Sequence, residues 1–233
     1  MEHSLTTPFC RDMGISIPVW NAGMGGGLAG PELAAAVSNA GGLGVLGMGG
    51  LPAQVIREEI RDLRSRTDKP FGVNLIIPLM GEEPQFEICV EERVPLLILF
   101  WGDPTPYVER AHAAGTKIGV QAGSAEEARA AAAAGVDFVV IQGVEAGGHV
   151  KGTTGLSIVL PATVDAVRPV PVVAAGGIAD GRGLAAALEL GAQAVSLGTR
   201  FLCSEESRAT PEYKERIVRA RAEDTYYTKL FDL

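Results

Sequence analysis

The chain has 233 residues and a formal net charge of −8 at pH 7, and 47% of its residues are hydrophobic. This length fits one α/β barrel, and the composition is that of a folded protein with a large core rather than of a disordered one. The acidic balance excludes the basic surface that nucleic-acid binding needs, and no apolar run is long enough to cross a bilayer.

Short apolar runs alternate with longer amphipathic or alanine-rich stretches along the chain, and glycine or proline marks the turns between them. Alternation of this kind predicts βα units. In chain order, strands are predicted at residues 18–22, 43–47, 71–75, 96–100, 117–121, 138–142, 172–175 and 194–197. Helices are predicted at residues 31–39, 52–66, 84–91, 106–114, 125–134, 158–167, 181–190 and 211–222.

The strands are apolar along nearly their whole length, as in residues 136–141, which is typical of a parallel sheet covered on both faces. We therefore predict a (β/α)8 TIM barrel that forms a single domain over residues 1–233. An open parallel sheet is the alternative, because alternation alone does not establish closure.

The cysteines and the N-terminus bear on redox chemistry and location. Cys10, Cys89 and Cys203 are far apart and odd in number, so neither a metal site nor a disulfide framework is predicted. The first residues lack a basic region followed by an apolar one, so no signal peptide is expected and the cytoplasm is the expected compartment.

A glycine-rich loop at residues 25–30 follows the first strand and fits the spacing of a dinucleotide fingerprint. That fingerprint is normally completed by an acidic residue about twenty positions later, but residues 47–50 contain no carboxylate. Close approach of the backbone to a flat ring at the barrel mouth explains the glycines as well, and a Rossmann site is the less favoured alternative.

Two further glycine loops end the seventh and eighth strands. They contain Ala175, Gly176 and Gly177, and Leu197, Gly198 and Thr199. Barrels often hold a phosphate at these two loops, and unpaired backbone N–H groups attract an anion without a cationic side chain. We therefore predict a phosphorylated cofactor at this position, although two ordinary tight turns would produce the same pattern.

His149 ends the loop that follows the sixth strand, after Gly147 and Gly148. Its place on the catalytic face of a barrel favours a role in proton transfer, with a structural histidine as the alternative. His3 and His112 have no such setting. Glu145 and Asp180 are interpreted as a loop acid and a helix cap rather than as catalytic carboxylates.

Several motifs taken together resemble the nitronate monooxygenase family, also known as 2-nitropropane dioxygenase-like proteins. The resemblance covers nearly the whole chain. Its motifs are residues 21–24, 72–74, 145–149, 175–183 and 197–201. The wider superfamily also contains FMN-dependent enoyl-acyl-carrier-protein reductases and NADH:quinone reductases, and the motifs do not separate these activities.

The resemblance implies a TIM barrel that binds FMN non-covalently. Ala22, Gly23 and Met24 would lie against the isoalloxazine, and Asn21 beside them would also belong to the cofactor site. Asn74, Gln121 and Gln142 would make polar contacts to the ring or ribityl chain. Gly147, Gly148, Ala175, Gly176, Gly177, Leu197, Gly198 and Thr199 would hold the phosphate side. His149 matches the catalytic base of the family.

The implied reaction takes a proton or an electron from a nitronate or nitroalkane and uses dioxygen to form a carbonyl compound and nitrite. The flavin would supply the redox chemistry, while the protein orients the substrate. The alternatives are an NAD(P)H-dependent enoyl-thioester or quinone reductase, and a flavin-binding barrel without catalytic activity. The implied partners are a small-molecule substrate and dioxygen, and self-association into a homo-oligomer is left open.

The sequence departs from the family pattern in three places. Asn21 stands where relatives often carry glutamine, and residues 150–152 extend the usual sequence after the histidine. Relatives usually continue beyond the eighth strand into helices that cover the active site. The resemblance therefore implies a barrel without the usual C-terminal helical extension, which would leave the flavin more open to water and oxygen.

Overall fold

The structure is a computed structural model that describes residues 5–81, 84–228 and 230. Within these residues, parallel strands form one eight-stranded sheet in the order β1-β8-β7-β6-β5-β4-β3-β2. The strands are β1 (Val19–Asn21), β2 (Gly44–Gly47), β3 (Phe71–Ile76), β4 (Leu96–Phe100), β5 (Lys117–Ala122), β6 (Phe138–Gln142), β7 (Val172–Ala175) and β8 (Ala194–Leu197). A parallel bridge between Trp20 and Leu43 brings the first and last strands of this order together. The predicted barrel is confirmed, and the open-sheet alternative is excluded.

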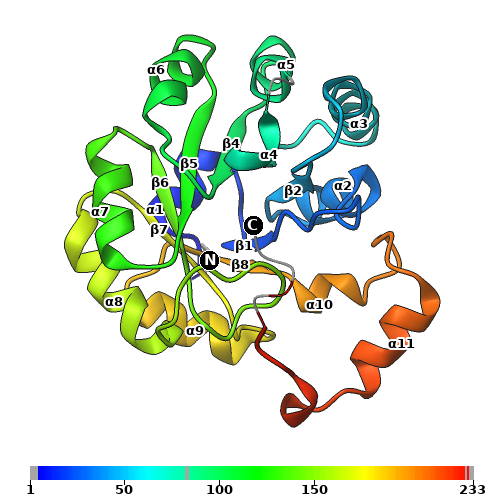
Figure 1. Ribbon diagram of the computed structural model, residues 1–233, viewed down its shortest axis with the longest axis vertical. Helices are drawn as coiled ribbons and strands as arrows, with labels where there is room; N and C mark the ends of the chain where they lie inside the picture. The colour runs from blue at the N-terminus through cyan, green and yellow to red at the C-terminus, as the bar shows by residue number, and fades with distance from the viewer. Residues whose placement is uncertain (1–4, 82–83, 229, 231–233) are drawn as a thin grey trace.

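The main helices surround the strands (Figure 1). They are α2 (Pro31–Asn39), α3 (Ala53–Arg66), α5 (Gln85–Glu91), α6 (Thr105–Ala113), α7 (Ala125–Ala133), α8 (Leu156–Val167) and α9 (Gly181–Glu189). Each lies within about two residues of its predicted bounds. The short helices α1 (Pro8–Met13), α4 (Ile77–Met80), α10 (Thr199–Leu202) and η1 (Ala222–Asp224) were not predicted. None of the described helices is long and apolar enough to cross a membrane.

The barrel interior is packed with aromatic side chains near the start of the strands. The rings of Phe9, Trp20 and Phe138 pack together, with centroids 5.5–5.8 Å apart. Phe9 belongs to α1, so this helix supplies part of the packing inside the barrel. Gly119 makes room for Phe138, because a Cβ at that position would lie 2.3 Å from the phenyl ring. The glycine in β5 therefore serves the core.

The seam between β1 and β2 depends on the side chain of Asn21, which is fully buried. Its Nδ2 donates to the carbonyl oxygens of Val45 at 2.7 Å and Ala22 at 3.1 Å. Its Oδ1 accepts from the Val45 N–H at 2.9 Å. The side-chain amide therefore joins the two strands where the backbone ladder between them is short.

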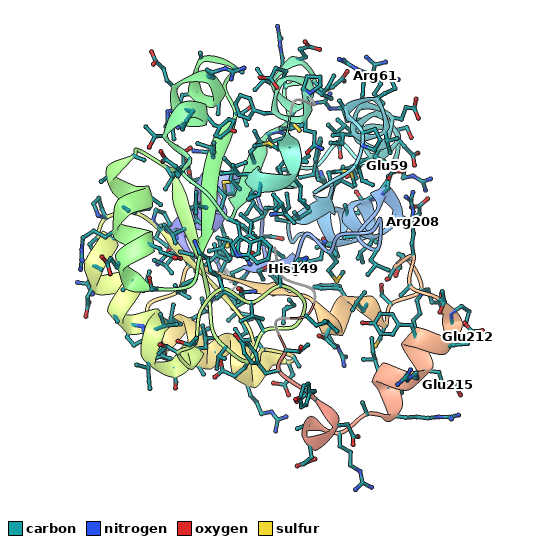
Figure 2. All side chains as sticks on the ribbon, viewed as in Figure 1. Glu59, Arg61, His149, Arg208, Glu212 and Glu215 are labelled. Atoms are coloured by element: carbon teal, nitrogen blue, oxygen red, sulfur yellow. The ribbon has the colours of Figure 1, made fainter. Side chains whose placement is uncertain are left out.

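Helix α11 (Pro211–Arg219) begins where predicted and ends three residues before its predicted end, and it buries none of its residues. It stands away from the ring of helices, at the lower right of Figure 1. Arg208, just before α11, forms ion pairs with Glu32 on α2 at 3.2 Å and Glu59 on α3 at 3.0 Å. Figure 2 shows Glu59 and Arg208 on the right-hand side of the molecule. The segment that follows the barrel is therefore tied to α2 and α3 before α11 begins.

Candidate active site

The carboxyl ends of the parallel strands meet at one end of the barrel, where TIM-barrel enzymes carry their active sites. The loops that contain the predicted site residues all begin at this end. Figure 2 shows His149 near the middle of the molecule, in front of the strands. Most of the predicted site residues therefore lie at the carboxyl end of the barrel, and their individual contacts decide what each can do.

The loop after β1 packs tightly against its neighbours. The Met24 N–H donates to the Ala22 carbonyl oxygen at 2.9 Å, which makes a tight turn. A Cβ on Gly23 would lie 2.3 Å from Cβ of Asn74, and a Cβ on Gly47 would lie 2.1 Å from the Met24 carbonyl oxygen. These glycines are needed for the protein's own packing, whatever else approaches the loop.

Asn74 and Gln121 lie at the same end of the barrel, on β3 and β5. Asn74 is buried, and its Nδ2 donates to the Ile98 carbonyl oxygen at 3.2 Å. Gln121 is half-buried next to the last residue of β5. The polar contacts that both side chains would make to a cofactor stay predictions.

The loops after β6, β7 and β8 touch one another. A Cβ on Gly147 would lie 3.3 Å from Thr199 Oγ1, and one on Gly177 would lie 3.2 Å from Glu145 Cβ. Gly176 and Gly177 have φ values of +108° and +67°, which favour glycine. Within the described residues, the N–H groups of Gly147, Gly176 and Gly177 donate no hydrogen bond. Backbone N–H groups of two neighbouring loops therefore lie close together without an acceptor among the described residues.

The remaining phosphate-side residues lie close by. Gly148 is exposed and has a φ of +71°, with open space where a Cβ would be. Ala175 and Leu197 are the buried last residues of β7 and β8, and a Cβ on Gly198 would lie 3.9 Å from Ala22 Cβ. The first glycine loop and the phosphate-side loops therefore share one surface.

The loop that carries His149 is held by the side chain of Gln142, which is 4% exposed. Gln142 Nε2 donates to the His149 carbonyl oxygen at 2.9 Å, and its Oε1 accepts from the Lys151 N–H at 3.3 Å. Lys151 in turn forms an ion pair with Glu127 on α7 at 2.9 Å. The main chain around the histidine is therefore anchored on both sides.

Two predicted cofactor contacts have other partners in the structure. Asn21 uses its side chain at the seam between β1 and β2, and Gln142 uses its side chain to hold the His149 loop. A contact of either amide with a flavin stays a prediction. Both residues nevertheless shape the mouth, because each fixes the backbone from which a candidate site loop begins.

Glu145 and Asp180 have the roles predicted for them. Both carboxylate oxygens of Glu145 accept from the Leu156 N–H, at 3.1 and 3.0 Å, at the start of α8. Asp180 caps α9, because its Oδ1 accepts from the N–H groups of Arg182 and Gly183. Hydrogen bonds from the Arg182 side chain and from these N–H groups lower the pKa of Asp180 to about 2. Both carboxylates therefore accept hydrogen bonds from backbone N–H groups at the start of a helix.

The sequence analysis missed Trp101 as a candidate site residue. This residue follows β4, and its ring lies 4.8 Å from the imidazole of His149 between centroids. It also stacks on Phe100, with centroids 4.6 Å apart and 22° between planes. The available signal was a large aromatic residue at the carboxyl end of a strand, directly before a Gly-Asp-Pro turn.

Other chemistry is sparse in the described part of the chain. The three cysteines are unpaired, and burial raises the pKa of Cys89 far above its usual range. The described residues contain no cluster of three or more His, Cys, Asp or Glu side chains that would hold a metal ion. A cavity of about 600 Å³ lies at the opposite end of the barrel, against Phe9 and Val172. The mouth is favoured as the site because of His149 and the backbone N–H groups of its glycine loops.

Comparisons with known proteins agree with this architecture. A curated relative from Rhodococcus jostii, named (3aS,4S,5R,7aS)-5-hydroxy-7a-methyl-1-oxo-octahydro-1H-indene-4-carboxyl-CoA dehydrogenase, is 36% identical over 229 residues, or 98% of this chain. A probable nitronate monooxygenase from Staphylococcus saprophyticus is 36% identical, over 97% of this chain and 76% of the relative. The solved structure of FabK from Thermotoga maritima is 42% identical with a TM-score of 0.91, over 96% of this chain and 71% of that one. The chain spans 64% of the length of the Rhodococcus relative.

The chain is an eight-stranded barrel with a histidine and glycine loops at its mouth, and its relatives are named as a dehydrogenase and as a probable nitronate monooxygenase. The family described as nitronate monooxygenase matches residues 7–92 and 81–232. The chain belongs to the nitronate monooxygenase family.

Proposed function

We propose that this chain is an FMN-dependent nitronate monooxygenase, which oxidises small alkyl nitronates or nitroalkanes with dioxygen to carbonyl compounds and nitrite. The observation that carries the proposal is the anchored His149 loop beside the glycine loops of the mouth. We also propose that residues 1–233 act as one flavin-binding domain, that the protein works in the cytoplasm, and that it needs no nucleic acid or membrane partner.

The residues at the mouth fit a flavin phosphate in the following way. The N–H groups of Gly147, Gly176 and Gly177 donate to nothing else in the described chain. Gly148 and Thr199 lie beside them. Backbone donors of this kind hold an anion without a cationic side chain, which suits a protein with a net charge of −8. They would hold the phosphate, with Ala175, Leu197 and Gly198 forming the floor at the ends of β7 and β8.

The flat part of the cofactor would lie against the loop after β1. Ala22, Gly23 and Met24 form a tight turn there, closed by the hydrogen bond from the Met24 N–H to the Ala22 carbonyl oxygen. Asn74 and Gln121 would supply polar contacts to the cofactor. Asn21 fixes the end of β1, from which this loop begins, through its hydrogen bonds to Val45. A bound flavin would supply the electron transfer and the chemistry with dioxygen.

His149 would act as the base. A neutral imidazole near physiological pH can take the proton from the carbon beside a nitro group, and it holds that proton at a ring nitrogen. Gln142 keeps the His149 main chain in place through its 2.9 Å hydrogen bond to the carbonyl oxygen. The protein's contribution is therefore a positioned base and a backbone cradle for the cofactor.

The test compares two substrates that differ only in that proton. The variant His149→Ala should lose turnover of neutral nitroalkanes by about 100-fold or more, and it should largely keep the oxidation of pre-formed nitronates. His112→Ala is the matched control, because His112 pairs with Asp137 at 2.9 Å on the outside of the barrel. Bound flavin is measured by absorbance in each variant, so that a loss of cofactor is recognised. An equal loss on both substrates would contradict the role of base.

The second candidate is an NAD(P)H-dependent reductase acting on an enoyl thioester or a quinone. It is favoured by the relatives that are not named as monooxygenases, including the carboxyl-CoA dehydrogenase and FabK. Anaerobic mixing of the flavin-loaded protein with NADH or NADPH separates the two candidates. Rapid bleaching of the flavin supports the reductase, and a persistent yellow flavin supports the monooxygenase. Tight flavin binding without turnover of nitronates or reduced nicotinamides would instead support a barrel that has lost its activity.

A further inference from the structure

Trp101 is a prominent residue of the barrel mouth to which the proposed function gives no role. It directly follows β4 and is half-buried. Its backbone φ is +53°, in the left-handed region that bulky residues rarely adopt. Strain of this kind persists only where surrounding contacts enforce it, and it gathers at functional sites.

The contacts that enforce this turn lie immediately after Trp101. Gly102 has a φ of +155°, and a Cβ there would lie 2.8 Å from the side chain of Ile77 on α4. Asp103 accepts from the N–H of Thr105 at 3.0 Å and from its hydroxyl at 2.6 Å, which fixes the start of α6. The chain therefore has little freedom on the carboxyl side of the tryptophan.

The indole ring contacts two other rings. It stacks on buried Phe100, with centroids 4.6 Å apart and 22° between the planes. It meets the imidazole of His149 at 4.8 Å between centroids and 58° between planes. The stack on Phe100 gives the indole a fixed support, so the imidazole rests against a surface that cannot easily move away.

Different groups hold the main chain and the side chain of His149. The hydrogen bond from Gln142 fixes the carbonyl group, and therefore the path of the loop. It does not set the side-chain torsions, which decide where the imidazole nitrogens point. The indole restricts those torsions, because it occupies the space on one side of the imidazole.

We propose that Trp101 is a positioning residue for His149. The strained turn after β4 holds the indole against the imidazole, and the indole in turn directs the imidazole towards the substrate. This inference rests on the proposed function, in which His149 takes the proton. A displacement of about 1 Å in a catalytic group lowers a rate by up to about 100-fold, so loss of the indole should act on kcat. KM should change little, because Trp101 acts through His149.

The kinetic test uses W101L and W101F, each alone and combined with H149A, in flavin-loaded protein. W101L should lower kcat for a neutral nitroalkane by about 10- to 100-fold, and W101F should restore most of the rate because it keeps an aromatic ring against the imidazole. In the H149A background W101L should cause no further loss. A further loss in that background, or a loss that falls mainly on KM, would overturn the proposal.

A control and a spectroscopic test accompany the kinetics. Y107L removes a half-buried aromatic ring that packs on Phe86, away from the mouth, and should leave kcat and KM for the neutral nitroalkane unchanged. The chain has three histidines, so imidazole C–H signals are few in an NMR spectrum, and H149A assigns the one from His149. The ring current of the indole should displace that signal in the wild type, and W101L should move it towards the signals of exposed histidines. An unmoved signal would overturn the proposal.

These readouts separate the two hypotheses. If the wild type fails to oxidise neutral nitroalkanes, the proposed function fails, while the NMR signal still decides whether the indole sets the imidazole position. If the wild type is active and W101L is equally active, Trp101 has no positioning role, and the proposed function stands.

Discussion

Replacing Asn21 with alanine tests whether one side chain holds the barrel seam. The substitution removes the hydrogen bonds to the N–H and the carbonyl oxygen of Val45, at 2.9 and 2.7 Å, in a place with no access to solvent. A buried backbone group left without a partner costs about 1–3 kcal/mol. Two such groups give a loss of about 3 kcal/mol in the free energy of unfolding, allowing for partial relaxation.

For a chain of this size, about 1 kcal/mol lowers Tm by about 2–4 °C, so Asn21→Ala should lower Tm by about 6–12 °C. The measurement is thermal unfolding followed by far-ultraviolet circular dichroism. Asn39→Ala is the control, because exposed Asn39 donates to the Arg66 carbonyl oxygen at 3.3 Å and should shift Tm by only about 1–2 °C. Equal shifts for the two variants would refute the reasoning. The flavin Kd, measured well below Tm, shows separately whether Asn21 also contacts the cofactor.

Two further substitutions test the phosphate loop and a helix cap. Gly177→Ala should weaken flavin binding about tenfold, because alanine is strained at a φ of +67° and its Cβ would meet Glu145. Gly181→Ala is the control and should leave the flavin Kd unchanged, because a Cβ at Gly181 would have no atom within 4 Å. Equal flavin affinities for the two variants would contradict a role of Gly177 in holding the phosphate. Asp180→Asn should lower Tm at pH 5, and the loss should become progressively smaller towards pH 2. Hydrogen bonds, chiefly from the Arg182 side chain, lower the pKa of Asp180 to about 2 in the folded protein, so the carboxylate stabilises the fold above its unfolded pKa. This stabilisation is lost as the pH falls through the folded pKa. A Tm difference that stays constant with pH would argue against this cap.

Much of the fold was predictable because each strand is buried on both faces and therefore carries an almost continuous apolar run. Helix starts were predictable where a side chain caps them, as at Ser124, whose Oγ accepts from the Glu127 N–H. The placement of α11 was not predictable. An amphipathic pattern shows that a helix has two faces, but it does not show whether another element covers the apolar one.

The candidate site was only partly predictable, because glycine motifs have more than one cause. Gly23 was expected to approach a cofactor, and its contact with Asn74 shows that the protein's own packing also requires it. Asn21 could not be assigned to the seam, because only the structure shows that its side chain faces Val45 on the next strand. Trp101 carried no local signature of its left-handed backbone.

The weak pairing of β1 with β2 determines how the barrel would open. Cooperative units with few backbone hydrogen bonds open first, and their amide hydrogens exchange with solvent sooner than those of the core. The Val45 amide, held by a side chain rather than by a ladder, should report such opening in hydrogen exchange. A ligand that contacts both the loop after β1 and Asn74 on β3 would bind only the closed barrel. It would therefore shift the opening equilibrium towards the closed state and slow the exchange of the Val45 amide. Cofactor loading and barrel closure would then be one linked equilibrium.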